Sequence, residues 1–279
     1  MKIIKYLSLI LVVALAVSCE KHELIYDATP VAGMAEFQLH YYVPVTATAA
    51  NNITKVEING KLFANNMSPL NTYNSIPSGA VGRFYTIDPG NINIKMYQGA
   101  DMATLVYDQN VTVTSGKQNI FVHDFNLAPV VFDNGYPYTA NITTHTDSTC
   151  WIKFYNFLYE TAGVPTTLRL QYQYIDPRNP AQVINIGPPV SFGETTGWQP
   201  VKVVKSIEIS SGYARIDYRI KVIDGSGNVV GDLQVMKSNG TYASYADYWT
   251  GYIGRRYHHI MSGMRATTLT SAVRVFTAL

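Results

Sequence analysis

The sequence predicts an all-β protein that folds as β-sandwiches. Beyond residue 31, short segments rich in Val, Ile, Thr, Tyr and Phe alternate apolar with polar residues, and Gly, Pro and Asn separate them. A period of two is typical of half-buried strands. Turn signals recur at intervals of roughly 8–12 residues, a spacing that favours sandwiches. No stretch carries a sustained apolar stripe of helical period, so we expect no long helix.

Residues 1–18 have the features of a signal peptide. Two lysines precede an apolar run, Leu7–Val17, which is shorter than the roughly 20 residues needed to cross a bilayer. Leu15-Ala16-Val17-Ser18-Cys19 resembles a lipobox, so we expect cleavage before Cys19 and lipid attachment to this cysteine. An ordinary secretory signal near an unrelated cysteine is the alternative. Each buried CH₂ of an acyl chain contributes about 0.8 kcal/mol, so the expected partner is a membrane, with residues 19–31 as the tether.

The composition excludes some classes of function. The formal net charge is only +2, so no basic surface indicates nucleic-acid binding. Charged residues make up 14% of the chain, against about 25% in a typical soluble protein. The surface must therefore rely on Asn, Thr, Ser and Tyr. With Cys19 lipidated, Cys150 is the one remaining thiol, and its place in an alternating run indicates a buried hydrophobic role.

The first predicted domain, residues 32–130, begins with an alternating strand. Phe37, Leu39 and Tyr41 are apolar and the residues between them are polar, as on a strand with one buried face. Val56-Glu57-Ile58 belongs to the next strand, and Asn59-Gly60 after it favours a tight hairpin because both residues tolerate positive φ. Further strands are expected at 84–87, 92–97, 111–113 and 119–122.

The second predicted domain, residues 149–279, repeats this pattern. Strands are expected at 151–155, 168–174, 214–222, 233–236 and 272–276. Between the domains, residues 131–148 contain Asn134-Gly135, Pro137 and a Thr-rich stretch, which predict a linker. Each domain is then of ordinary size.

The two halves resemble a diverged repeat. Val113–His123 is echoed by Gly251–Ile260, and Ser75–Gly79 by Gly197–Val201. Four segments, Val56–Gly60, Ser75–Gly79, Thr114–Lys117 and Phe192–Trp198, are similar to tandem Ig-like domains of unknown function in envelope lipoproteins of Bacteroides-like bacteria. The resemblance implies two Ig-like antiparallel β-sandwich domains and an envelope location, and it implies no reaction.

Reactive motifs are not found. The chain has no G-x-S-x-G, no H-E-x-x-H and no phosphate-binding glycine loop, so we expect no catalytic residue and no cofactor. His258 and His259 are neighbours on a predicted strand and should point to opposite faces, which argues against a metal there. Asp224, Ser226 and Asn228 have calcium-loop spacing, but Val229 replaces the expected glycine. A hairpin turn explains these residues better.

Two sets of residues are candidates for binding or modification. Tyr248, Trp249, Tyr252 and Trp198 are candidate ligand contacts, because flat amphipathic rings stack on sugars or on a protein partner. The alternative places these rings in the sandwich core. Ser148, in Asp147-Ser148-Thr149, resembles a short O-glycosylation signal of Bacteroides-like bacteria.

We therefore expect an outer-membrane or cell-surface lipoprotein that binds a glycan or an envelope protein without catalysis, displayed on the surface rather than facing the periplasm. The first alternative is a pilin-like fimbrial subunit, in which Ala272–Phe276 would complete a neighbour's sheet by strand addition. An envelope enzyme is the third possibility.

Overall fold

The all-β prediction is confirmed. The structure, a computed structural model, describes residues 31–78, 82–134, 149–176, 179, 181–203, 208–210, 213–268 and 270–278. Strands make up 62% of it, and the one helical element among these residues is a short 3₁₀ turn, Ala49–Asn51. No helix in this part of the chain has the length and apolar character that crossing a membrane requires.

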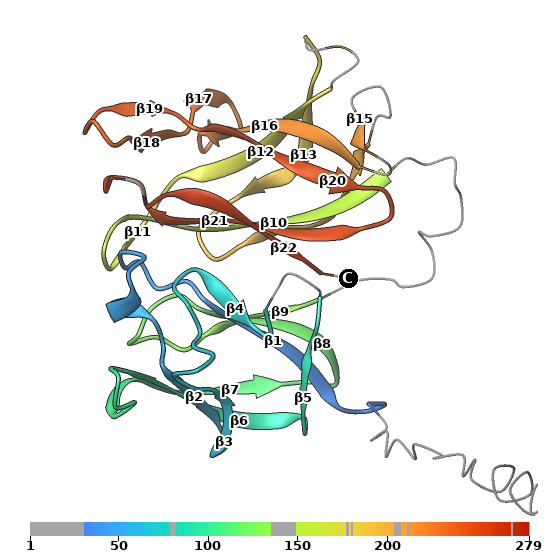
Figure 1. Ribbon diagram of the computed structural model, residues 1–279. Coiled ribbons are helices and arrows are strands. Elements are labelled where there is room, and N and C mark those ends of the chain that lie inside the picture. The colour runs from blue at the N-terminus through green and yellow to red at the C-terminus, as the bar shows by residue number, and fades with distance from the viewer. Residues whose placement is uncertain are drawn as a thin grey trace, which may run out of the picture. The chain divides into compact units, whose positions relative to one another are not determined.

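The first sandwich consists of two sheets that enclose one hydrophobic core (Figure 1). One sheet has the order β4-β1-β8-β9, with β5 also pairing with β1, and the other has the order β3-β2-β6-β7. Phe37 and Leu39 of the first sheet and Val56 and Ile94 of the second are fully buried in this core. The strands are β1 (Ala35–Tyr41), β2 (Lys55–Ile58), β3 (Lys61–Ala64), β4 (Asn74–Ile76), β5 (Tyr85–Ile87), β6 (Gly90–Gln98), β7 (Thr104–Val113), β8 (Gly116–Val122) and β9 (Val130–Asp133).

The second sandwich encloses its own core. One sheet has the order β11-β10-β21-β22, with β14 also on β10; the other has the order β13-β12-β16-β15, with β17 and β20 also on β16. A small hairpin, β18 with β19, lies beside them. The strands are β10 (Thr149–Thr161), β11 (Val164–Pro165), β12 (Arg169–Ile175), β13 (Val183–Val190), β14 (Thr195–Lys202), β15 (Glu208–Ser210), β16 (Tyr213–Ile223), β17 (Val229–Asp232), β18 (Gln234–Met236), β19 (Tyr242–Ser244), β20 (Ala246–Tyr252), β21 (Arg256–Met264) and β22 (Ala272–Thr277).

Two strand pairs differ from the expected antiparallel arrangement. β1 runs parallel to β8, and β10 runs parallel to β21. Parallel neighbours need a long crossover connection. In the first half of the chain this connection contains β2 to β7, and in the second half it contains β11 to β20. Alternation in sequence predicts strands without predicting the direction of their partners, so this pairing was missed.

The two halves share this topology, as a repeat would. In the first half, β1 lies between the parallel strand β8 and the antiparallel strand β4, and β9 is antiparallel to β8. In the second half, β10 lies between the parallel strand β21 and the antiparallel strand β14, and β22 is antiparallel to β21. The segments that resemble each other in sequence occupy matching places. Val113–His123 contains β8 and Gly251–Ile260 contains the start of β21, while Ser75 and Gly197–Val201 lie on β4 and β14.

A third apolar cluster joins the two sandwiches. Its buried members are Tyr42, Tyr73, Phe121, Tyr155, Phe157 and Ile260, from both halves of the chain. The rings of Phe121 and Phe157 stack with centroids 4.8 Å apart, so the outer face of β1 and β8 packs on that of β10 and β21. This contact also covers a polar side chain: His40 is fully buried, and its ring lies 6.3 Å from that of His258.

Residues 31–279 form one compact unit by their contacts, with one core in each predicted domain. Their division into two separate domains stays a prediction. Since β9 covers Val130–Asp133, the first residues of the predicted linker form a strand instead. The remainder of that segment, residues 135–148, lies outside the described residues.

Candidate functional site

The sequence-predicted sites fall in different parts of the chain. Cys19 and Ser148 lie outside the described residues. The four candidate aromatic residues are described, and the structure brings only two of them, Tyr248 and Tyr252, onto one surface.

Trp249 is a core residue, which corrects its assignment as a ligand contact. It lies on β20 between two residues that point the other way, because neighbours on a strand face opposite sides. Its side chain is 6% exposed, and its ring centroid lies 4.9 Å from that of Tyr257 and 4.6 Å from that of His259. For this residue the core interpretation holds.

Trp198 belongs to the junction between the sandwiches. It is half-buried on β14, and its indole Nε1 donates a hydrogen bond to the carbonyl oxygen of Asn134 at 2.5 Å. Its ring lies 5.2 Å from that of His258. These contacts tie β14 to the residue that follows β9, so Trp198 has a structural role apart from the two tyrosines.

Tyr248 and Tyr252 lie on the outer face of β20. The guanidinium carbon of Arg215 is 3.8 Å from the ring centre of Tyr248, and that of Arg255 is 4.3 Å from the ring centre of Tyr252. The quadrupole of an aromatic ring attracts a guanidinium that lies over the ring face, so each contact helps to hold its tyrosine ring in place. Tyr248 still has 53% of its surface exposed. Four residues of strand separate the Cα atoms of the two tyrosines by about 13 Å, and Tyr252 is partly buried against the second core.

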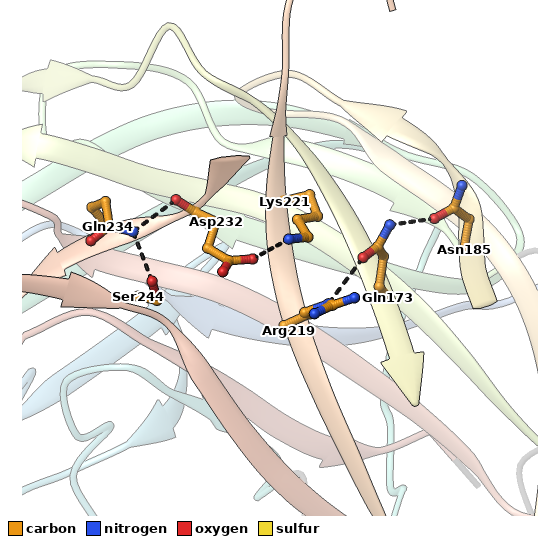
Figure 2. A network of polar contacts seen from close by, with 7 residues as sticks. All are labelled: Gln173, Asn185, Arg219, Lys221, Asp232, Gln234 and Ser244. Atoms are coloured by element: carbon orange, nitrogen blue, oxygen red, sulfur yellow. Dashed lines mark hydrogen bonds and ion pairs between the residues drawn. The ribbon is translucent and has the colours of Figure 1, made fainter. Parts of the chain in front are cut away.

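A row of hydrogen-bonded polar side chains extends across the same sheet (Figure 2). Gln173 is central to it: its Nε2 donates to Asn185 Oδ1 at 2.7 Å, and its Oε1 accepts from Arg219 Nε at 3.2 Å. Lys221 forms an ion pair with Asp232 farther along. We call this outer face the tyrosine face, and its members are Gln173, Asn185, Arg215, Asp217, Arg219, Lys221, Tyr248 and Tyr252.

The polar members of the tyrosine face were not recognised from the sequence, although a signal for them exists. Gln171 and Gln173 alternate with Leu170 and Tyr172 in β12, and β16 alternates in the same way. The apolar positions fill the core, so the polar positions must share the other face. What the sequence could not supply is the pairing of β12, β13 and β16 that sets these side chains next to one another.

A pocket of about 400 Å³ lies at the Asp232 end of the row. Leu168, Val222 and Val230 are its apolar lining, and Arg265 is among its polar residues. Arg265 forms an ion pair with Glu160, and Asp232 is paired with Lys221. Because both charges are compensated, the pocket has no strong preference for a charged ligand.

Reactive groups do not converge on the tyrosine face. Among the described residues, no three His, Cys, Asp or Glu side chains are grouped so that they could hold a metal ion. Cys150 is fully buried, which confirms its predicted core role, and burial raises the pKa of its thiol. Asp224 Oδ1 accepts hydrogen bonds from the amides of Ser226 and Asn228 at 2.9 and 2.8 Å, so this segment is the predicted hairpin turn.

No protein-family model matches the chain. Comparison with curated proteins gives no match either.

Proposed function

We propose that the protein is a non-enzymatic binding protein of the bacterial envelope, held at a membrane by lipid on Cys19, and that the tyrosine face binds a glycan. The supporting observation is that an exposed tyrosine, Tyr248, and a partly buried one, Tyr252, share one open sheet with a row of amide, guanidinium and ammonium groups. Aromatic rings stack on the apolar face of a sugar. Amide and guanidinium groups hydrogen-bond to its hydroxyls.

The charges of the tyrosine face favour a glycan over a protein partner. Arg215 and Asp217 are both about half exposed, at 49% and 50% of their side-chain surface, and Arg219 and Lys221 follow on the same strand. The cores of protein interfaces are depleted in charged residues. A face with this many charges suits a ligand that keeps most of its own water.

A glycan array tests this proposal, using residues 31–279 as the compact unit. We expect binding to one or more glycans that falls at least about tenfold in the double variant Tyr248→Ala, Tyr252→Ala, because stacking surface is lost. The matched control is Tyr97→Ala. Tyr97 also has a cation over its ring, Lys55 Nζ at 3.9 Å from the ring centre, but it belongs to the first sandwich. An empty array, or equal loss in both variants, would reject the tyrosine face as the site.

The membrane anchor is tested separately on the full chain. We expect the protein to enter the detergent phase in a Triton X-114 partition, and Cys19→Ser to move it to the aqueous phase. Protease treatment of intact cells then tests surface display. Digestion supports a surface location, whereas protection until lysis shows that the protein faces the periplasm.

Modification of Ser148 belongs to the same proposal. Intact-mass measurement of protein from its native host should show a glycan mass that Ser148→Ala removes. Thr149 is the matched control, since it begins β10. Loss of the mass in Thr149→Val with retention in Ser148→Ala would reassign the site.

The pilin-like alternative has less support in its predicted form. Ala272–Thr277 pairs with β21 over six residue pairs within its own sheet, so donation of this strand to a neighbour would first require its removal. Filaments or ladders on native gels would favour that alternative.

A further inference from the structure

A second pocket lies on the first sandwich, at the edge of the sheet that contains β1. β4 pairs with Leu39–Tyr41 and β5 pairs with Ala35–Phe37. Two separate strands therefore pair with the same edge of β1, one on each side of Gln38. The cavity has a volume of about 360 Å³, which is within the range that accommodates a small ligand. It shares no lining residue with the tyrosine face, so it is a separate site.

Phe63 and Tyr85 form an aromatic wall of this pocket. Their ring centroids lie 5.0 Å apart at an interplanar angle of 70°, and both rings pack on Phe37, at 5.6 and 5.9 Å. Phe37 is fully buried in the core, so the wall is anchored before any ligand arrives. Such preorganisation lowers the ordering cost of binding. A ring wall suits the apolar C–H face of a sugar.

Ser68, Asn71 and Ser78 supply polar groups on the lining. Among the described residues, their side chains form no hydrogen bond within the protein, although the backbone that carries the first two is well held. The amide of Ser68 donates to Asn65 Oδ1 at 3.2 Å. Leu70, between Ser68 and Asn71, exchanges two backbone hydrogen bonds with Ile53, both 3.0 Å. The backbone of this lining is therefore held, and the exposed side chains offer hydrogen-bond donors and acceptors to a ligand.

Arg83 is the one charged residue among the eleven that line this pocket. Its carbonyl oxygen accepts a hydrogen bond from Gln38 Nε2 at 2.8 Å, which holds its backbone at the pocket. Its side chain is exposed, and no described residue forms an ion pair with it. An uncompensated guanidinium offers a planar fork that matches a carboxylate with two parallel hydrogen bonds.

We propose that this pocket binds an acidic sugar, a pyranose that carries a carboxylate. Arg83 takes the carboxylate, the wall of Phe63 and Tyr85 takes the C–H face of the ring, and Asn71 with the two serines takes the hydroxyls. A neutral sugar would leave the guanidinium unused. A simple inorganic anion would leave the aromatic wall unused.

Nuclear magnetic resonance titration of residues 31–279 tests the proposal, with glucuronate and N-acetylneuraminate as probes. We expect shifts at residues of the pocket, and binding at least about tenfold weaker for glucuronamide, which has lost the charge. Arg83→Gln should weaken glucuronate binding by a similar factor. Lys202→Gln is the control, because it removes an exposed positive charge from the other sandwich and should change nothing.

Three results would overturn the proposal. The first is the absence of pocket shifts up to about 10 mM sugar, an affinity too weak to matter. The second is full binding by Arg83→Gln. The third is phosphate binding as tight as glucuronate, which would make the pocket a general anion site. The variant Tyr248→Ala, Tyr252→Ala should bind glucuronate normally, so failure here and failure of the tyrosine face are distinguishable.

Discussion

His258 and His259 are neighbours in the chain, yet their imidazole rings lie in different hydrophobic environments on opposite faces of β21. His258 lies at the junction, where its Nδ1 is 3.0 Å from the hydroxyl of Tyr155 and its ring is 6.3 Å from that of His40. His259 lies in the second core beside Trp249. This separation confirms the sequence prediction that the two rings point to opposite faces of the strand.

Burial of these histidines predicts an acid-sensitive fold. It lowers the pKa of His40 to about 4 and that of His259 to about 3, and it also lowers the pKa of His258. An unfolded histidine titrates near pH 6.5, so below that pH the unfolded chain binds more protons than the folded chain. The stabilisation is complete above about pH 6.5 and is lost as the pH falls toward 4 and then 3. For His40 alone the loss is about 3 kcal/mol.

Urea unfolding between pH 7 and 4 measures this dependence. Carboxylates also contribute below about pH 5, so the comparison with His40→Gln isolates the histidine. Glutamine can still donate a hydrogen bond to Asn119, the present partner of His40. The variant should show a shallower decline than the wild type. Parallel curves would mean that His40 does not contribute.

Trp249 and Tyr248 form a matched pair for testing the two sides of β20. Trp249→Ala should destabilise the protein by about 3–5 kcal/mol, because a buried ring leaves a cavity. Tyr248→Ala should change the unfolding free energy by no more than about 1 kcal/mol, since the residue is exposed and loses only its contact with Arg215. Chemical denaturation of both variants decides the assignment. A mild effect of Trp249→Ala would return this residue to the ligand candidates.

Gly263 on β21 is a position where the backbone requires glycine. Its φ is +97°, and an added Cβ would lie 2.1 Å from the carbonyl oxygen of Thr270. Gly263→Ala should therefore cost about 2 kcal/mol or more, since strain and a backbone clash add together. Gly225→Ala is the control, because an added Cβ there meets nothing within 4 Å. Equal melting temperatures for the two variants would contradict this account.

The limits of the sequence prediction follow from what covers each strand. Phe37, Leu39 and Tyr41 are fully buried, as their alternation predicts, because one core covers that face. Alternation could not predict the burial of His40, since the rings of His258 on β21 and Phe276 on β22 lie beside it, from far along the chain. The candidate site was limited in the same way. The residue types alone identified Tyr248 and Tyr252 as candidates. Trp249 was wrongly grouped with them because Ala246–Tyr252 was not recognised as a strand, on which Trp249 points to the opposite face.

The junction also predicts how the protein unfolds. All three tryptophans, Trp151, Trp198 and Trp249, lie in the second half of the chain. Tryptophan fluorescence therefore reports the second sandwich and, through Trp198, the junction, whereas circular dichroism reports both sandwiches. Because Phe121 and Phe157 pack across the junction, we expect the two signals to coincide in the wild type, as in a two-state transition. Phe157→Ala should cost about 3–5 kcal/mol and separate the two curves.

The control for this experiment is Phe37→Ala. Phe37 is equally buried, but it lies in the core of the first sandwich alone, so its loss weakens one sandwich while the junction contacts remain. If the junction couples the sandwiches, both signals should move together in this variant, including the fluorescence from the half that was not altered. Fluorescence and circular dichroism curves that already differ in the wild type would show that the two sandwiches are independent domains, as the sequence predicts.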